Sequence, residues 1–265
     1  MTRWLTLTSM LAAWSICGSM ANAAADIPGL WDFDQPAQSE TRFRAALERA
    51  QGDERLELLT QIARTQSLRK QFDEAHRLLD EIEPRLHAAG PAPRVRYLLE
   101  RGRTFRSAGA PEKARPLFVG AWELGRASGH DGLSIDAAHM IALVESGLEE
   151  QLAWNRRGLE LARNATDAYA RNWRASLHNN IGWSLHDAGR YGEALAEFEL
   201  ALNERERRAQ VNEIRIAKWA VARCLRSLGR RDEALAIQRA LKAEWAAEGN
   251  EDKYVLEELH HLGSE

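Results

Sequence analysis

Histidines are the residues in this chain that could bind a metal ion, but their spacing does not favour a joint site. His178 and His186 are eight residues apart, which is about 12 Å along a helix axis and too far for one ion. His260 and His261 are adjacent and would point to different sides of a helix. The sequence also contains no G-x-G-x-x-G, P-loop, H-E-x-x-H, C-x-x-C or G-x-S-x-G motif. We therefore predict no catalytic residues, no metal site and no cofactor.

Arginine is the other residue type that could bind a ligand, and it is abundant: 31 of the 36 basic residues are arginines. Its guanidinium binds carboxylates and phosphates through two parallel donors, whereas lysine acts as a point charge. Genomic base composition is the competing explanation for this bias. The formal net charge of -3 argues against a general nucleic-acid role. We therefore expect an acidic protein or peptide to be a better match for these arginines than a nucleic acid.

The N-terminus predicts export. Arg3 precedes an apolar run, and Ala21-Asn22-Ala23 provides the small residues that a signal peptidase needs. We expect residues 1–23 to be a signal peptide, the mature chain to have no transmembrane segment, and the protein to be periplasmic or secreted. An uncleaved N-terminal anchor is the alternative, and a lipid anchor at Cys17 is disfavoured by the bulky residue before it. Cys224 would then be the only cysteine of the mature chain, and its neighbourhood predicts a small buried hydrophobe.

Two series of positions recur with a period of about 40 residues. The first series comprises Ala63, Gly102, Ala142, Gly182 and Ala222, and the second Ala75, Ala114, Trp154, Ala194 and Ala234. Small residues let two helices approach closely. Turn positions fall between the two series at Lys70, Gly109, Glu149, Gly189 and Gly229. Behind the second series, Leu79, Phe118 and Phe198 are expected to fill the gap between hairpins.

These patterns resemble the tetratricopeptide repeat (TPR) family, whose pattern has a Leu-Gly pair, a later Ala and a Phe four residues further on. Ile181-Gly182, Ala194 and Phe198 match it. The resemblance covers roughly residues 55–245. It departs from the family in its period, which is about 40 residues rather than 34, and in the third repeat, where Trp154 occupies a small position. That hairpin is expected to be splayed or shifted in register.

The resemblance implies which residues face the concave groove, because the first helix of each TPR hairpin lines it. The implied positions lie three before, one after and four after each residue of the first series, on one helical face. Across five repeats these fifteen positions hold five arginines, two histidines, two tryptophans and no acid. We predict a partner-binding groove that contains Arg64, Arg103, Arg106, His139, Asn179, Trp183, His186, Trp219, Arg223 and Arg226. The remaining positions are Thr60, Ser67, Leu99, Leu143 and Ser146.

The predicted fold class is all-α: a right-handed α-solenoid of about five TPR-like hairpins with N- and C-terminal capping helices. Residues 24–38 are expected to be an extended lead-in and residues 39–265 the solenoid, with capping helices over 39–50, begun by Ser39, and over 250–262. We predict an exported scaffold or adapter whose groove binds a protein or peptide, either acidic or with a free C-terminal carboxylate. The first alternative is a homo-oligomer assembled through other surfaces, in which the groove arginines only pair with acids on neighbouring helices. The second, less favoured alternative is an enzyme that uses His139, Asn179 and His186.

Overall fold

The computed structural model describes residues 25–264, and every regular element in that range is helical. The helices are α1 (Ile27–Leu30), α2 (Pro36–Leu47), α3 (Gly52–Leu68), α4 (Phe72–Ile82), the 3-10 helix η1 (Glu83–Ala88), α5 (Pro91–Ser107), α6 (Pro111–Ala127), α7 (Asp131–Ala142), α8 (Leu148–Asn164), α9 (Ala168–Asp187), α10 (Tyr191–Glu206), α11 (Val211–Ser227), α12 (Arg231–Ala247) and α13 (Lys253–His261). No helix in this range is both long and apolar enough to cross a membrane. The predicted signal peptide lies outside the described residues.

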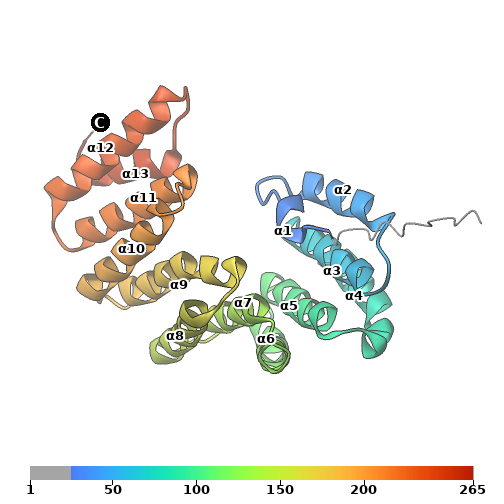
Figure 1. The fold of residues 1–265 in the computed structure, drawn as a ribbon. Helices are drawn as coiled ribbons and strands as arrows, with labels where there is room; N and C mark the ends of the chain where they lie inside the picture. The colour runs from blue at the N-terminus through green and yellow to red at the C-terminus, as the bar shows by residue number, and fades with distance from the viewer. Residues whose placement is uncertain (1–24, 265) are drawn as a thin grey trace, which may run out of the picture.

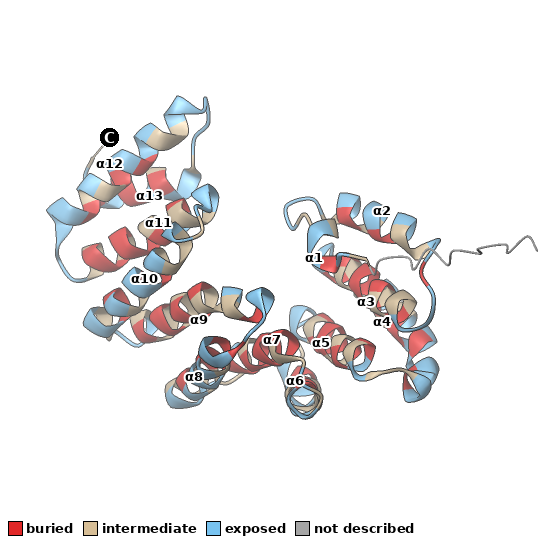
Figure 2. Cartoon of the chain, in the orientation of Figure 1, coloured by how far each residue is buried: buried red, intermediate tan, exposed pale blue. Residues whose placement is uncertain are grey.

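Ten of these helices form five consecutive hairpins, from α3–α4 to α11–α12, and successive hairpins stack into a curved array. The first helix of each hairpin lies on the inner side of the curve, and the second lies on the outer side (Figure 1). Buried residues follow the faces that neighbouring helices turn toward one another (Figure 2). The prediction of an α-solenoid of five hairpins with capping helices is confirmed.

The turns between paired helices lie where the sequence predicts them in four of the five hairpins. Gly109, Gly189 and Gly229 have φ values of +85°, +74° and +79°, a region that glycine enters without steric cost. Lys70 occupies the same position in the first hairpin with φ at +63°. These residues end the first helix of each hairpin and let the chain reverse.

The small positions allow an aromatic side chain to pack directly on a helix backbone. A Cβ atom added to Gly182 would lie 2.7 Å from Cδ1 of Phe198, and one added to Gly102 would lie 2.5 Å from Cε1 of Phe118. Both phenylalanines are fully buried. Glycine is therefore required at these two positions by close packing within the hairpin, whereas the phenylalanines were expected to fill the gap between hairpins.

Replacing Gly182 with alanine is expected to lower the free energy of unfolding by about 1–3 kcal/mol, because the added methyl group displaces the Phe198 ring. Gly192 is the matched control, since it lies in the adjacent helix α10 and a Cβ there would meet nothing within 4 Å. Gly192→Ala should change the free energy of unfolding by about 0.5 kcal/mol or less, because Gly192 lies in the first turn of α10 and the added methyl group meets nothing. Urea denaturation followed by circular dichroism measures both changes. Equal effects of the two substitutions would contradict this packing.

The third hairpin departs from the predicted register. Helix α7 has 12 residues and ends at Ala142, and α8 already begins at Leu148. The turn therefore precedes Glu149, which was wrongly expected to be the turn residue. The close approach is displaced as well, because a Cβ added to Gly158 would lie 3.5 Å from Cβ of Ala138. Gly158 and Ala138 thus make the close contact that was expected at Trp154 and Ala142, one helical turn away on each helix. Trp154 instead packs edge-on against Trp122, with ring centroids 5.7 Å apart.

The N-terminal segment is not the extended lead-in expected over residues 24–38. It forms α1, and α2 begins at Pro36, three residues before the expected start at Ser39. Ser39 is not a helix cap: its hydroxyl, buried within α2, accepts from the Asp32 amide at 2.7 Å and donates to the Asp32 carbonyl at 2.9 Å. These two bonds fold residues 25–35 back onto α2 and α3. At the other end α13 covers the last hairpin, as predicted.

Candidate partner-binding groove

The ten predicted groove residues all lie on the first helices of the hairpins, α3, α5, α7, α9 and α11. Contacts place eight of them in two groups; of the other two, Arg106 is exposed and Asn179 is half-buried. The first surrounds Arg64, Arg103 and His139, and the second contains Trp183, His186, Trp219, Arg223 and Arg226. Three of the remaining implied positions, Thr60, Ser67 and Leu99, are buried. The predicted face is therefore only partly available to a partner.

Arg103 is committed to acids of this chain. Its guanidinium donates to Oε1 of Glu100 at 2.6 Å and to Oδ1 of Asp136, and both acids are nearly inaccessible to solvent. Burial alone would raise the pKa of Asp136, but the charges of Arg103 and Arg64 lower it. The same acids raise the pKa of Arg103 against the effect of burial. This arginine is part of a buried ionic network, and its charge is already balanced by acids of this chain.

The two acids were missed because the groove positions came from the family pattern alone. Glu100 lies three residues before Arg103, and Asp136 lies three residues before His139. Residues three apart are neighbours on a helix surface, so this spacing could have indicated that both acids border the groove face.

His139 and His186 belong to separate environments. His139 Nδ1 lies 2.7 Å from the side-chain nitrogen of Asn180, and its ring packs near Trp173 at 5.6 Å. Burial, followed by the positive charges around it, lowers the pKa of His139 to about 4, so the ring is neutral at pH 7. His186 Nε2 instead contacts the Ser227 hydroxyl at 2.9 Å. The two histidines have different partners, and it is Asn180 rather than Asn179 that contacts His139.

The second group forms a row of aromatic side chains, which we name the aromatic wall: Trp183, Trp219 and Tyr254. The ring centroids of Trp183 and Trp219 are 6.0 Å apart, as are those of Trp219 and Tyr254. The guanidinium of Arg223 lies 5.7 Å from the Trp183 ring and 5.3 Å from the Trp219 ring. Tyr254 comes from the capping helix α13, outside the repeats, and therefore was not among the predicted residues.

Arg223 and Arg226, the two predicted groove arginines on α11, differ in their contacts with Glu258 of α13. Arg226 donates to both oxygens of Glu258, at 2.7 and 3.0 Å, and so holds α13 against the last hairpin. Arg223 approaches the same carboxylate only to 3.7 Å, and its Nε is buried without a hydrogen-bond partner. The Arg223 side chain is 40% exposed and forms no hydrogen bond within the described residues, so it keeps donors for another ligand, whereas Arg226 is paired with Glu258.

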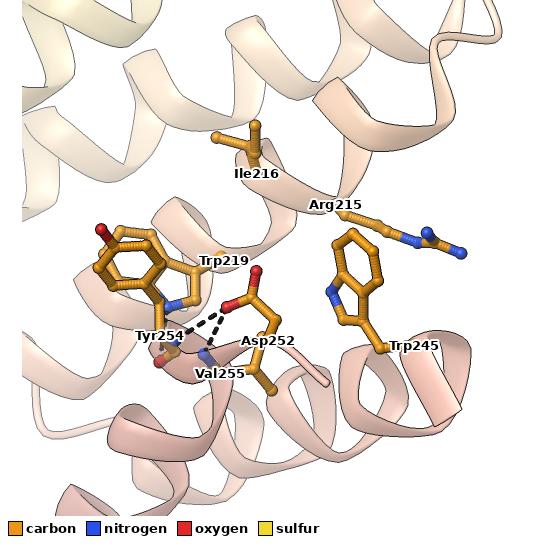
Figure 3. Close-up of a pocket in the computed structure, with 7 residues that line it drawn as sticks. All are labelled: Arg215, Ile216, Trp219, Trp245, Asp252, Tyr254 and Val255. Carbon is orange, nitrogen blue, oxygen red and sulfur yellow. Dashed lines mark hydrogen bonds between the residues drawn. The ribbon is translucent and has the colours of Figure 1, made fainter. Parts of the chain in front are cut away.

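An apolar pocket of about 260 Å³ adjoins the aromatic wall. Trp219 and Tyr254 lie on one side of it and Trp245 lies on the other, with Ile216 and Asp252 between them (Figure 3). Asp252 is fixed because its Oδ1 accepts from the amides of Tyr254 and Val255 at the start of α13. Arg215 stacks on Trp245 at 4.4 Å and pairs with Glu244 and Glu248. The pocket therefore has a rigid rim and an apolar interior.

Cys224 is buried, as predicted, and its thiol lies 3.2 Å from the Tyr191 carbonyl. Burial raises the pKa of this thiol to about 11, so it stays protonated and unreactive near neutral pH. Within residues 25–264, no group of three or more His, Cys, Asp and Glu side chains is placed to hold a metal ion.

Comparison with known proteins identifies the fold. No family model and no curated protein matches the chain. Among solved structures, BtubC (BKLC) from P. vanneervenii superposes with a TM-score of 0.65 and 15% identity, over 86% of this chain and 94% of that one. The apo form of RapI gives a TM-score of 0.68 and 13% identity, over 89% and 66% of the two chains. The TPR-like repeats of a putative kinesin light chain from Podosopora anserina give 0.60 and 14%, over 76% and 99%. The chain thus has the fold of a TPR-type helical repeat protein.

Proposed function

We propose that this protein is a scaffold or adapter that binds a segment of a protein partner along the aromatic wall and in the adjoining apolar pocket. The observation that carries this proposal is the apolar surface left uncovered there. Ile216 and Tyr254 are 59% and 53% exposed, although each lies beside other apolar side chains. Contiguous exposed apolar and aromatic residues are typical of binding sites rather than of idle surface.

Arg223 gives the proposed site a preference for acidic residues. Its guanidinium lies beside two indole rings, at 5.7 and 5.3 Å, and its 40% exposed side chain makes no hydrogen bond within the described residues, which suits a carboxylate on the partner. The acidic preference therefore rests on Arg223 rather than on the whole set of arginines. The partner would place an apolar side chain in the pocket and an acidic group beside Arg223. The sequence pattern of residues 1–23 further leads us to propose that this binding takes place in the periplasm or outside the cell.

Affinity capture with the tagged protein, followed by mass spectrometry, would supply a partner for calorimetry. Trp219→Ala should weaken binding by about 2–4 kcal/mol, because Trp219 contributes to both the wall and the pocket. Arg223→Glu should weaken it by at least about 1.4 kcal/mol, which is tenfold. Arg239→Glu is the matched control, since Arg239 is exposed on the neighbouring helix α12 and should leave affinity unchanged.

Unchanged affinity in a folded Trp219→Ala protein would contradict the proposed site. If the wild type forms a homo-oligomer in analytical ultracentrifugation and captures no partner, the assembly alternative takes its place.

A further inference from the structure

A second pocket, which we name the N-terminal pocket, lies where the folded-back N-terminal segment meets the inner helices. Its volume is about 270 Å³, and its lining comes from residues 27–33 and from α3, α5, α7 and α9. It shares no residue with the apolar pocket near the C-terminus. This volume is slightly below the range of pockets that hold drug-sized molecules, so it suits a smaller ligand.

Arg64 offers this pocket an unused set of hydrogen-bond donors. Its guanidinium lies 5.2 Å from the Trp31 ring and 5.1 Å from the Phe33 ring, and its nearest acid is Glu100 at 3.7 Å. It forms no hydrogen bond with any described residue, since its 3.7 Å contact with Glu100 is too long for one. Burial, and then the charge of Arg103, lower the pKa of Arg64. A carboxylate in the pocket would satisfy this arginine through paired charge-assisted hydrogen bonds.

Asp136 provides an acceptor in the same pocket. Its Oδ1 accepts from Arg103, whereas its Oδ2 makes no hydrogen bond within the described chain. A ligand that carries both a carboxylate and an ammonium group could therefore be bound at both ends, by Arg64 and by Asp136.

Aromatic side chains from the N-terminal segment and from the start of α9 complete the lining. Trp31 and Phe33 stack at 4.6 Å with nearly parallel rings, and Trp31 Nε1 donates to Gln61 Oε1 at 3.0 Å. On α9, the ring of Tyr169 lies directly on Gly132, where any Cβ atom would overlap it. Trp173 is next to it and packs near His139. These contacts hold flat apolar surfaces around the arginine and the carboxylate.

We propose that the N-terminal pocket binds a free α-amino acid with an apolar or aromatic side chain. Arg64 would donate to its carboxylate, Asp136 Oδ2 would accept from its ammonium group, and the aromatic residues would contact its side chain. Because the pocket is small, at about 270 Å³, a free amino acid fits it better than the terminus of a peptide, whose chain would have to continue outward. This proposal is independent of partner binding at the aromatic wall.

Calorimetry of the purified protein with L-phenylalanine, L-tryptophan, L-leucine and L-methionine tests the proposal, and at least one should bind. For L-phenylalanine as the example, 3-phenylpropanoate lacks the ammonium group and 2-phenylethylamine lacks the carboxylate. For whichever amino acid binds, the two analogues that lack one charged group should each have an affinity at least about 10-fold lower than the parent amino acid. Arg64→Gln should reduce affinity by a similar factor. Arg77→Gln, an exposed arginine on α4, should change it less than twofold.

Circular dichroism will show whether Arg64→Gln is folded, and Trp173→Phe provides a second readout. A ligand-dependent change in tryptophan fluorescence should be present in the wild type and reduced in Trp173→Phe. Absence of binding by all four amino acids at millimolar concentration would overturn the proposal, as would undiminished binding by folded Arg64→Gln. Equal or tighter binding of the tripeptide Ala-Ala-Phe than of free phenylalanine would assign the pocket to a peptide terminus instead.

Discussion

Replacement of Arg103 with methionine should lower the free energy of unfolding by about 3–5 kcal/mol, the usual cost of removing one partner from a buried ionic network. Arg103 donates to both Glu100 and Asp136, and these acids are 1% and 4% exposed. Without the guanidinium, two carboxylates would remain buried, with Arg64 at 3.7 Å from Glu100 as their nearby cation. Urea denaturation at pH 7 measures the change.

The pH dependence distinguishes this mechanism from a loss of packing. In the wild type the pKa of Asp136 lies below its ordinary value of 3.8. The ion pair therefore stabilises the fold above that value and is lost as the pH falls through the lowered pKa. In Arg103→Met the pKa of Asp136 should rise, so the difference in stability from the wild type should shrink on acidification toward pH 4.

Arg106→Met is the control: Arg106 is exposed on the same helix, and its replacement should change stability by about 0.5 kcal/mol or less. A difference between wild type and Arg103→Met that is independent of pH would contradict the ionic explanation.

Replacement of Phe198 with alanine should also cost about 3–5 kcal/mol. The Phe198 side chain is 1% exposed, packs on the backbone at Gly182 and meets the Trp183 ring edge-on at 4.9 Å. Its loss would leave a cavity inside the fourth hairpin and remove support from one end of the aromatic wall. Chemical denaturation measures the stability, and partner calorimetry should show weaker binding than in the wild type.

Leu200→Ala provides the control on the same helix, because Leu200 is 45% exposed and its loss should cost less than about 1 kcal/mol. A double mutant tests the contact itself. In the Phe198→Ala background, Gly182→Ala should no longer destabilise the protein, since the ring that it displaces is absent. Additive effects of the two substitutions would show that Gly182 and Phe198 do not act through this contact.

The sequence alone was sufficient to predict the helical hairpins, their number and most of their turns. This was achievable because each hairpin is a local structure whose requirements recur at a constant interval. Gly182 must be small because Phe198 packs on it, and Gly189 must reverse the chain; the equivalent residues meet the same needs about 40 residues away. A periodic pattern records such short-range constraints directly.

The state of the candidate site was decided by contacts between elements far apart in the sequence. Arg103 and Arg226 match the groove pattern as well as Arg223 does, yet Asp136 on α7 and Glu258 on α13 bind the first two and leave Arg223 with free donors. Tyr254 joins the aromatic wall from outside the repeats.

The N-terminal segment and the third hairpin illustrate the same limit. Trp31 and Phe33 lie beside Arg64 because hydrogen bonds from Ser39 and apolar packing hold the N-terminal segment against α2 and α3. In the third hairpin, the close contact between Gly158 and Ala138 is one helical turn away from the positions that the repeat pattern predicts. A repeat pattern records which residue types are required where each helix packs against the next helix in the sequence. Which charges are neutralised, and which surfaces remain open, depends on packing between side chains that no short-range spacing brings together.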